Sequence, residues 1–340
     1  MVDFDPSGVG IKGSLFGFPY QPEDADLIII PMPWDVTVSY GAGTALGPKA
    51  ILDASVQLDF ELYGVERPWS YPVAMVENLL FEKDNIQSRQ LAEAIIDELE
   101  QDKPVDSNQL RMVNQACQEM FLHGHDLAST WLDRGKKVAF LGGDHSTPLG
   151  LIKALSDQQS FGILQIDAHM DLRQAYEGFE FSHASIMYNA IRLERIQSIT
   201  QVGIRDYCEE EVNFIKQSEN PIHVFYDDQV KAGMMQGHSW HDWVEQIIAT
   251  LPDRVYISFD IDGLQPFLCP NAGTPVPGGL TFEEADYLLR AVARSGKEII
   301  GFDLSEVGPG ENEWDANVGA RILYRLCTYL GLSSGQLNWD

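Results

Sequence analysis

The sequence contains few cysteines, and their spacing excludes two common kinds of site. Among 340 residues the cysteines are Cys117, Cys208, Cys269 and Cys327. No pair has the CxxC spacing of a zinc ribbon, and scattered cysteines do not make the dense framework of a disulfide-stabilised domain. We therefore expect free thiols and a reducing, cytoplasmic setting.

Basic residues are also scarce, which argues against polyanionic partners. Lys and Arg total 23 against 51 Asp and Glu, a formal net charge of -28. This charge repels phosphate backbones and anionic lipid surfaces, so we expect no nucleic-acid partner. The acidity is typical of a solubility adaptation, and it also suits a protein that attracts metal ions or a positively charged substrate.

Long apolar runs are absent as well. No run reaches the ~18 residues that cross a bilayer, so we expect no membrane partner. Residues 1–17 lack the basic start and apolar centre of a signal peptide. No repeat, low-complexity tract or Pro/Gly/Ser linker divides the chain. We expect one domain over residues 1–340, with residues 1–25 as an N-terminal extension.

Short apolar runs alternate with longer amphipathic segments, which predicts an α/β fold with a parallel sheet. Strands are expected at 26–34, 136–144, 161–169, 198–206, 254–262 and 298–306. Runs that are apolar throughout are typical of strands buried on both faces. Helices are expected at 47–62, 107–133 and 281–297. The last helix begins with a capping box, formed by Thr281 and Glu284.

Acidic and histidine side chains follow four of these predicted strands. They are Asp144 and His145, then Asp167, His169 and Asp171, then Asp260 and Asp262, and finally Glu306. The carboxyl ends of parallel strands are where α/β sheets bind ligands, so we expect these side chains to lie together. Residues 167, 169 and 171 stand at every second position, which points them to one side of an extended segment.

Such a cluster needs positive charge to balance it. Four carboxylates and two imidazoles without counter-charge would be destabilised by burial and mutual repulsion. Two divalent cations would cancel the carboxylate charge, and oxygen-rich donors with a minority of imidazole suit Mn²⁺. Two such ions ~3.5 to 4 Å apart lower the pKa of a shared water enough to supply hydroxide near neutral pH. The predicted ligands are His145, Asp167, His169, Asp171, Asp260 and Asp262.

These motifs resemble those of the ureohydrolases, which include arginase, agmatinase, guanidinobutyrase and formimidoylglutamase. The similarity runs from VSYGAGTALGPKAI (residues 38–51) through LGGDHS, DAHMDLR, SHAS, SFDIDGLQP and GTPVPGGL to DLSEVGPG. The resemblance implies a three-layer α/β/α sandwich around a mostly parallel sheet and two Mn²⁺ per chain. It also implies a homo-oligomer, a trimer or hexamer, that releases urea or a similar amide from a small cationic guanidino substrate.

The resemblance assigns roles to residues beyond the six ligands. Glu306 matches the carboxylate that holds the guanidinium, Thr274 a position near it, and His183 of FSHAS a histidine that transfers a proton. A carboxylate can accept two parallel N–H bonds from a guanidinium, and an imidazole can protonate a departing amine. Asp171 joins His183 and Glu306 in the expected catalytic set. From context alone, His183 could be an ordinary loop histidine and Glu306 an acid at a helix N-terminus.

The loop DLRQAYEGFEFSHAS (residues 171–185) is similar to the loop of bacterial agmatinases. It lacks the Asn- and Ser-bearing segment with which arginases hold the α-amino acid group. We therefore expect conversion of agmatine to putrescine and urea, in polyamine metabolism. Arginine, guanidinobutyrate, formimidoylglutamate and guanidine stay open as alternative substrates.

Two alternatives come from other classes of protein. A deacetylase would use one Zn²⁺ held by an Asp-His-Asp set, which leaves His145 and Asp262 unexplained. An inactive metal-binding relative would be expected to lack part of the ligand set or Glu306, and none is missing. The histidines of HGH (123–125) and HSWH (238–241) have no matching carboxylate set, so we expect them on helix faces.

Overall fold

The computed structural model describes residues 4–78 and 82–340. Its main sheet has eight strands in the order β3-β1-β4-β9-β8-β5-β6-β7, and each neighbouring pair is parallel. The strands are β1 (Leu27–Met32), β3 (Val73–Met75), β4 (Lys137–Gly142), β5 (Phe161–Ile166), β6 (Ile196–Ile204), β7 (Ile222–Tyr226), β8 (Arg254–Asp260) and β9 (Glu298–Ser305). A separate antiparallel ribbon pairs β2 (Val65–Glu66) with β10 (Asn338–Trp339).

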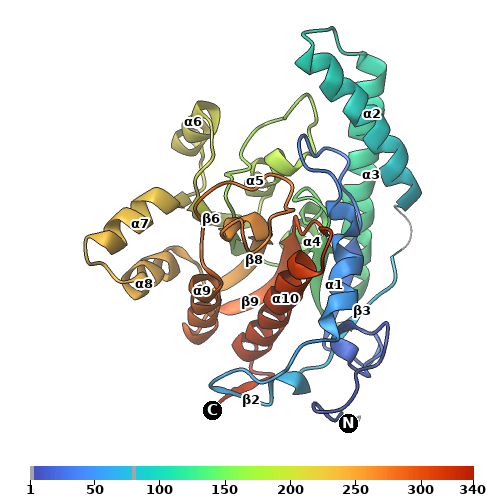
Figure 1. Cartoon of the computed structure of the whole chain (residues 1–340). Coiled ribbons are helices and arrows are strands. Elements are labelled where there is room, and N and C mark those ends of the chain that lie inside the picture. The colour runs from blue at the N-terminus through green and yellow to red at the C-terminus, as the bar shows by residue number, and fades with distance from the viewer. Residues whose placement is uncertain (1–3, 79–81) are drawn as a thin grey trace.

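Helices cover both faces of the main sheet (Figure 1). The α-helices are α1 (Gly47–Ser55), α2 (Glu82–Glu100), α3 (Ser107–Leu132), α4 (Leu149–Gln158), α5 (Ile186–Ile191), α6 (Glu209–Gln217), α7 (Asp227–Met235), α8 (Trp240–Thr250), α9 (Phe282–Arg294) and α10 (Trp314–Ser333). Short 3-10 turns are η1 (Leu15–Gly17), η2 (Thr44–Leu46), η3 (Pro68–Ser70), η4 (His183–Ser185) and η5 (Ile261–Gly263). Among the described residues, no helix combines the length and apolar character needed to cross a membrane.

The alternation of side chains along the strands creates two cores. In β1, Leu27 and Ile29 join the core under α1, α9 and α10, whereas Ile28 and Ile30 join the core under α3, α4 and α5. A strand whose neighbouring side chains are all buried needs a helical layer on each face. The predicted three-layer α/β/α sandwich with a parallel sheet is therefore confirmed.

The structure adds elements that the sequence pattern did not reveal. Strands β3 and β7 at the sheet edges are short, and α2 was not predicted. The helix expected at 47–62 ends at Ser55, because buried and exposed side chains then alternate: Gln57 and Asp59 are exposed, whereas Leu58 and Phe60 are buried. That period of two suits an extended segment lying on the core and does not suit a helix. The hairpin of α2 and α3 extends past one side of the sheet (Figure 1).

The predicted start of α9 is confirmed in detail. The Glu284 N–H donates to the Thr281 hydroxyl at 3.1 Å, and the Thr281 N–H donates to the Glu284 carboxylate at 2.9 Å. Within residues 1–25, Leu15, Phe16 and Phe18 are buried in the core. Phe16 packs edge-on against Tyr324 of α10, with ring centroids 5.2 Å apart. The N-terminal segment is thus tied to the rest of the fold.

Candidate active site

The predicted site residues follow four neighbouring strands at the centre of the sheet. His145 follows β4, Glu306 follows β9, Asp260 ends β8, and Asp167 follows β5. These strands are adjacent in the order β4-β9-β8-β5, although β9 comes last along the chain. Because all are parallel, their carboxyl ends lie at one edge and bring the side chains together.

One group of side chains surrounds the Nδ1 atom of His145. This atom lies 3.0 Å from Asp167 Oδ2, 2.9 Å from Asp171 Oδ2 and 3.4 Å from Asp260 Oδ2. Two atoms that bind one cation at about 2.1 Å, at right angles, lie roughly 3 Å apart. The donor atoms of His145, Asp167 and Asp260 are close enough to hold one ion.

A second group shares Asp167 with the first. His169 Nδ1 lies 3.1 Å from Asp262 Oδ2 and 3.6 Å from Asp167 Oδ1. Asp167 therefore directs one carboxylate oxygen toward each histidine. Asp167, His169 and Asp262 form a second set able to hold an ion, so the two sets meet at Asp167.

The protonation of these groups reflects their crowding. Burial and the neighbouring Asp167 raise the pKa of Asp171 to about 7. Burial and Asp262 likewise raise the pKa of Asp260 well above its usual range. Burial opposes the charged form of His169, but Asp262 and Asp167 raise its pKa to about 12. The carboxylates thus require positive charge beside them, and their oxygen-rich donor set with two imidazoles fits a hard or borderline divalent cation.

Hydrogen bonds from residues outside the two groups orient His145 and Asp167. His145 Nε2 lies 2.9 Å from the Ser258 hydroxyl. This contact leaves the other ring nitrogen, Nδ1, available to bind a cation. Gln165 Nε2 donates to Asp167 Oδ2 at 2.7 Å, and Gln201 Nε2 donates to Gln165 Oε1 at 2.6 Å. Both glutamines are fully buried on the paired strands β5 and β6. The sequence reasoning missed them, although a glutamine inside an apolar strand is a detectable signal.

Glu306 lies beside both groups in a strained backbone conformation, with φ of +65°. Its Oε1 accepts the backbone N–H of His145 at 2.9 Å. Its Oε2 is buried, and within residues 4–78 and 82–340 it has no hydrogen-bond partner. A Cβ on Gly273 would lie only 2.6 Å from Oε2, so only glycine leaves room beside this buried oxygen. Burial and the nearby Asp144 raise the pKa of Glu306 well above its usual range.

His183 and Thr274 line a cavity of about 340 Å³ that also includes His169 and Asp171. In the described part of the chain, the buried Nδ1 of His183 has no hydrogen-bond partner. Burial and the charges of His169 and His145 lower the pKa of His183 to about 3, so its imidazole is neutral at pH 7. The Thr274 hydroxyl lies 3.5 Å from Asp262 Oδ2, which is long for a hydrogen bond.

The outer wall of this cavity contains charged and aromatic residues that sequence reasoning did not single out. They are Tyr40, Arg173, Tyr176, Asp206 and Tyr207. The Arg173 guanidinium carbon lies 4.8 Å from the centre of the Tyr176 ring. The Asp206 side chain is 67% exposed and lies 3.9 Å from His169 Nε2. Because such residues are scattered in loops, they have no strand-end pattern to reveal them.

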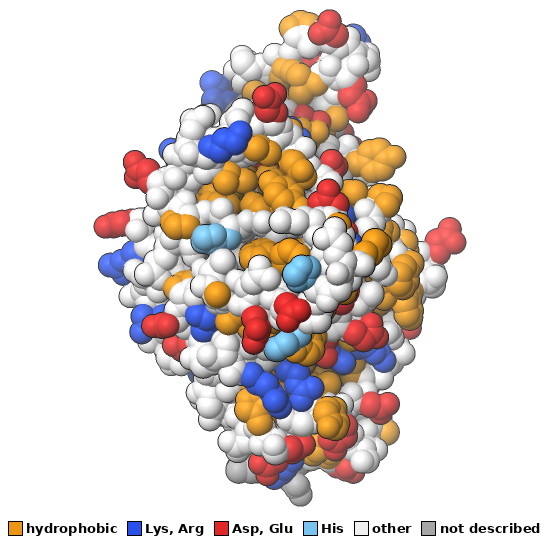
Figure 2. All heavy atoms as spheres, turned by 90° about the vertical axis from the view of Figure 1, so that its left-hand side faces the viewer, with side chains coloured by type: hydrophobic (Ala, Val, Ile, Leu, Met, Phe, Trp, Pro, Cys, Tyr) orange, Lys and Arg blue, Asp and Glu red, His pale blue; other side chains and the backbone are white. Residues whose placement is uncertain are grey.

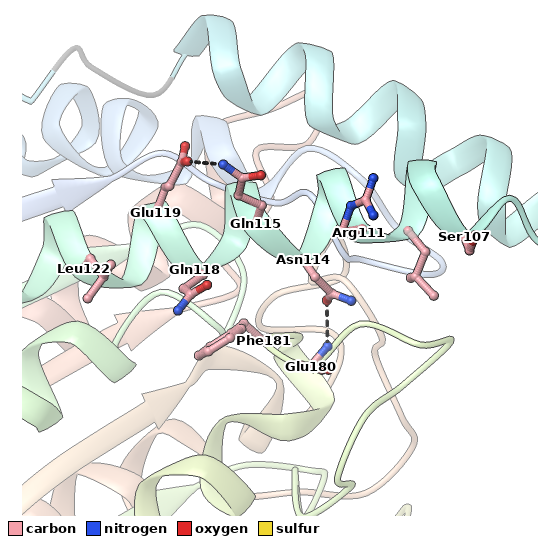
Figure 3. Close-up of a pocket in the computed structure, with 10 residues that line it drawn as sticks. Ser107, Arg111, Asn114, Gln115, Gln118, Glu119, Leu122, Glu180 and Phe181 are labelled. Carbon is pink, nitrogen blue, oxygen red and sulfur yellow. Dashed lines mark hydrogen bonds between the residues drawn. The ribbon is translucent and has the colours of Figure 1, made fainter.

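A larger hollow lies elsewhere. It has a volume of about 710 Å³ between α3 and residues 180–181 (Figure 3). Side chains that line this hollow form hydrogen bonds with one another: Gln115 donates to Glu119 at 2.8 Å, and Asn114 accepts the Glu180 N–H at 2.9 Å. None of its lining residues belongs to the two carboxylate and histidine groups, so its size does not make it the chemical site.

The remaining polar candidates lie away from the two groups. His123 and His125 are on α3, where His125 Nε2 is 2.9 Å from Asp157. His241 is on α8, as expected, but His238 precedes that helix. Acidic, basic and histidine side chains are intermixed on the face beside α6, α7 and α8 (Figure 2). Asp144, which directly precedes His145, accepts the Ser146 N–H at 2.9 Å. The four cysteines form no disulfide.

Known proteins are similar to this chain over most of its length. The N(1)-aminopropylagmatine ureohydrolase of Synechocystis sp. is 28% identical over 316 residues, which are 91% of this chain and 90% of the relative. The agmatinase of Proteus mirabilis is 31% identical over 318 residues, which are 90% of this chain and 89% of the relative.

Solved structures share the fold. The agmatine ureohydrolase of Thermoplasma volcanium has a TM-score of 0.69 at 23% identity and covers 94% of both chains. Proclavaminate amidino hydrolase from Streptomyces clavuligerus has a TM-score of 0.72 at 22% identity, covering 94% of this chain and 97% of that one. The family model described as Arginase family matches residues 25–328. The chain therefore belongs to the Arginase family and is a ureohydrolase, a hydrolase that acts on guanidino compounds.

Proposed function

We propose that this enzyme hydrolyses agmatine to putrescine and urea with two Mn²⁺ ions. The observation that carries the proposal is the buried, unpartnered Oε2 of Glu306 beside two carboxylate and histidine groups. A planar guanidinium can donate N–H bonds to that oxygen and neutralise its charge. Its central carbon would then face the metal groups.

The six predicted ligands would hold the two ions, with Asp167 shared between them. His145, Asp171 and Asp260 would complete one set, and His169 with Asp262 the other. When bound, a pair of divalent cations lowers the pKa of a water molecule so that it becomes nucleophilic near pH 7. The support for Mn²⁺ is the donor chemistry: four carboxylates and two imidazoles, with no thiolate.

The reaction adds one water molecule. Its oxygen bonds to the guanidinium carbon, the bond from that carbon to the alkyl nitrogen breaks, and the departing amine gains a proton. His183 supports this last step because it lines the cavity and, among the described residues, its buried Nδ1 has no hydrogen-bond partner. Such an imidazole can take up a proton released at the site and pass it to the amine. Thr274, which lines the same cavity, would lie near the guanidinium.

The outer wall suits an amine at the far end of the substrate. The exposed carboxylate of Asp206 attracts an ammonium, and the faces of Tyr40 and Tyr207 can contact it. Tyr40 is 86% exposed and Tyr207 44% exposed, so the cavity opens to solvent. This opening supports a second candidate substrate, N(1)-aminopropylagmatine, after which several relatives are named.

Parallel assays of Mn²⁺-loaded protein test the proposal. Urea release would be followed from agmatine, N(1)-aminopropylagmatine, arginine, 4-guanidinobutyrate and guanidine, and formamide release from formimidoylglutamate. We expect the highest kcat/KM for one of the first two compounds, since specificity is a ratio of kcat/KM values. A preference for arginine or 4-guanidinobutyrate would refute the amine-binding wall, and no turnover of any compound would refute the proposed activity.

We further propose that the chain folds as one domain over residues 1–340 and assembles as a cytoplasmic trimer or hexamer. The one-domain proposal rests on the lack of a repeat or linker in the sequence, the cytoplasmic setting on the scattered cysteines, and the assembly on the resemblance to ureohydrolases. Light scattering on the purified protein tests the assembly, because a trimer and a hexamer differ twofold in mass. A monomer at working concentration would refute it.

A further inference from the structure

Arg205, the first residue after β6, donates hydrogen bonds to backbone carbonyls of three segments. Its Nη2 donates to Asp262 at 2.7 Å, to Val276 at 2.9 Å and to Leu264 at 3.2 Å. Its Nε lies 3.2 Å from the carbonyls of Val276 and Pro277, and its Nη1 donates to Gly203 at 3.0 Å. One guanidinium thus joins the end of β6, the turn after β8 and the loop at 276–277.

The backbone of Arg205 adds a fourth connection. Its N–H donates to the Ala168 carbonyl at 2.8 Å, between the candidate ligands Asp167 and His169. Asp262, another candidate ligand, offers its carbonyl to the side chain of the same arginine. Arg205 therefore contacts the backbone at both strands that supply the second metal group.

In the loop at 274–277, the carbonyls of Val276 and Pro277 accept hydrogen bonds from this arginine. Thr274, Pro275 and Val276 form part of the cavity wall, and the two prolines at 275 and 277 have no N–H to donate. Without these two N–H groups the loop cannot form a regular ladder of backbone hydrogen bonds. The planar fork of an arginine can bond several carbonyls in fixed directions, which the single ammonium of lysine cannot do.

The loop also passes close to the arginine side chain. A Cβ on Gly278 would lie 3.0 Å from Arg205 Cδ and 2.7 Å from Asp227 Oδ2. The N–H of Gly279 donates to that same Asp227 oxygen at 3.0 Å. The loop is therefore packed between Arg205 and Asp227, and a change in the arginine would move its backbone.

We propose that Arg205 is a positioning residue that holds the 274–277 loop against the metal-binding strands and so shapes the substrate cavity. The proposal deepens the proposed function and rests on it for its kinetic consequence. Because the loop lines the cavity, it would contact substrate in the ground state and the transition state alike, so its displacement should weaken binding more than it slows the chemical step.

The test compares Arg205→Lys and Arg205→Gln with the wild type. We expect about a tenfold rise in KM and a change of less than about threefold in kcat, the pattern of lost uniform binding. We also expect faster amide hydrogen exchange in peptides covering 272–280, with exchange in β9 unchanged. Arg195→Gln is the matched control, since Arg195 is exposed and donates to one carbonyl, that of Asp157, at 2.6 Å.

The outcomes separate the two proposals. If both folded variants keep wild-type KM or wild-type exchange at 272–280, Arg205 does not position the loop for substrate. A lower melting temperature with unchanged KM and exchange would show a purely structural role and overturn the proposal. If no guanidino compound is turned over, the proposed function fails, while hydrogen exchange still decides whether Arg205 holds the loop. If Arg205→Gln does not fold, Arg205→Lys carries the test.

Discussion

His145 and Glu306 are 161 residues apart in sequence, yet the His145 N–H donates to the Glu306 carboxylate at 2.9 Å. The Glu306 N–H in turn donates to the Gly143 carbonyl at 2.7 Å. These bonds hold the carboxylate proposed to bind the guanidinium at a constant distance from a proposed metal ligand. The backbone of the adjacent strands β4 and β9 would thus set the position of the proposed substrate relative to the proposed metal group.

Replacement Glu306→Gln should lower kcat/KM by about two to three orders of magnitude, the cost of removing one partner of a buried charge pair. The amide keeps the size of the side chain, so metal content should stay at the wild-type value. Steady-state kinetics and metal analysis of the same preparation check this. Turnover within about twofold of wild type would exclude Glu306 as the guanidinium partner.

Replacement Asp260→Asn should reduce metal binding and abolish turnover. Asp260 Oδ2 lies 3.4 Å from His145 Nδ1, and an amide supplies no negative charge to a cation. Elemental analysis after dialysis measures the bound metal. Full activity in this variant would show that the ligand assignment is wrong.

Replacement His183→Asn should keep both metals and slow catalysis by about a hundredfold or more, the usual contribution of a proton-transfer group. His183 lines the cavity but does not belong to either metal-binding set. Metal content and kcat are the measurements. If the variant lost bound metal, His183 would be a metal ligand and the proposed proton-transfer role would be wrong.

Replacement Arg173→Gln should change kcat/KM for agmatine by less than about threefold, because an ammonium does not bind to a guanidinium. Arg173 is nevertheless the residue that would attract a substrate carboxylate at the cavity wall. The same variant therefore discriminates between substrates. A large loss of activity confined to 4-guanidinobutyrate or arginine would identify a carboxylate-bearing substrate and contradict the amine assignment.

Metal-free protein should become less stable as pH rises from about 5 to about 8. The pKa of Asp171 is raised to about 7 and that of His169 to about 12 in the folded state, so the folded protein binds more protons at these two groups over this range than the unfolded chain does. Stability from such a group is present at low pH and is lost as pH rises through the folded pKa. Thermal unfolding of chelator-treated protein measures this.

Added Mn²⁺ should remove most of this pH dependence, and its affinity should rise over the same range because the cation displaces protons. Calorimetric titration at pH 6 and pH 8 measures the affinity. A metal-free melting temperature that rises with pH between 5 and 8 would contradict the crowding of carboxylates around Asp171.

Much of the site could be predicted because its residues occupy strand ends. A buried parallel strand is marked by an apolar run, and Asp167, His169 and Asp171 follow such a run at every second position. The prediction that the helix continues to residue 62 was wrong. Leu58 and Phe60 pack into the core, and burial in that segment therefore alternates with a period of two. The edge strand β3 has three residues, too few for a local pattern to mark it. The edge strand β7 is only partly buried and contains His223, so no uninterrupted apolar run marks it.

Local patterns in the sequence were enough to predict the α/β class, the central strands and the set of side chains gathered at their carboxyl ends. These properties depend on local period and on the rule that parallel strands end at one edge. The folded arrangement was needed to find that Asp167 directs one oxygen to each histidine, that Gln165 orients it, and that Arg205 joins three distant segments. Those relationships are distances between residues remote in sequence, and they follow from strand order and packing that no local pattern contains.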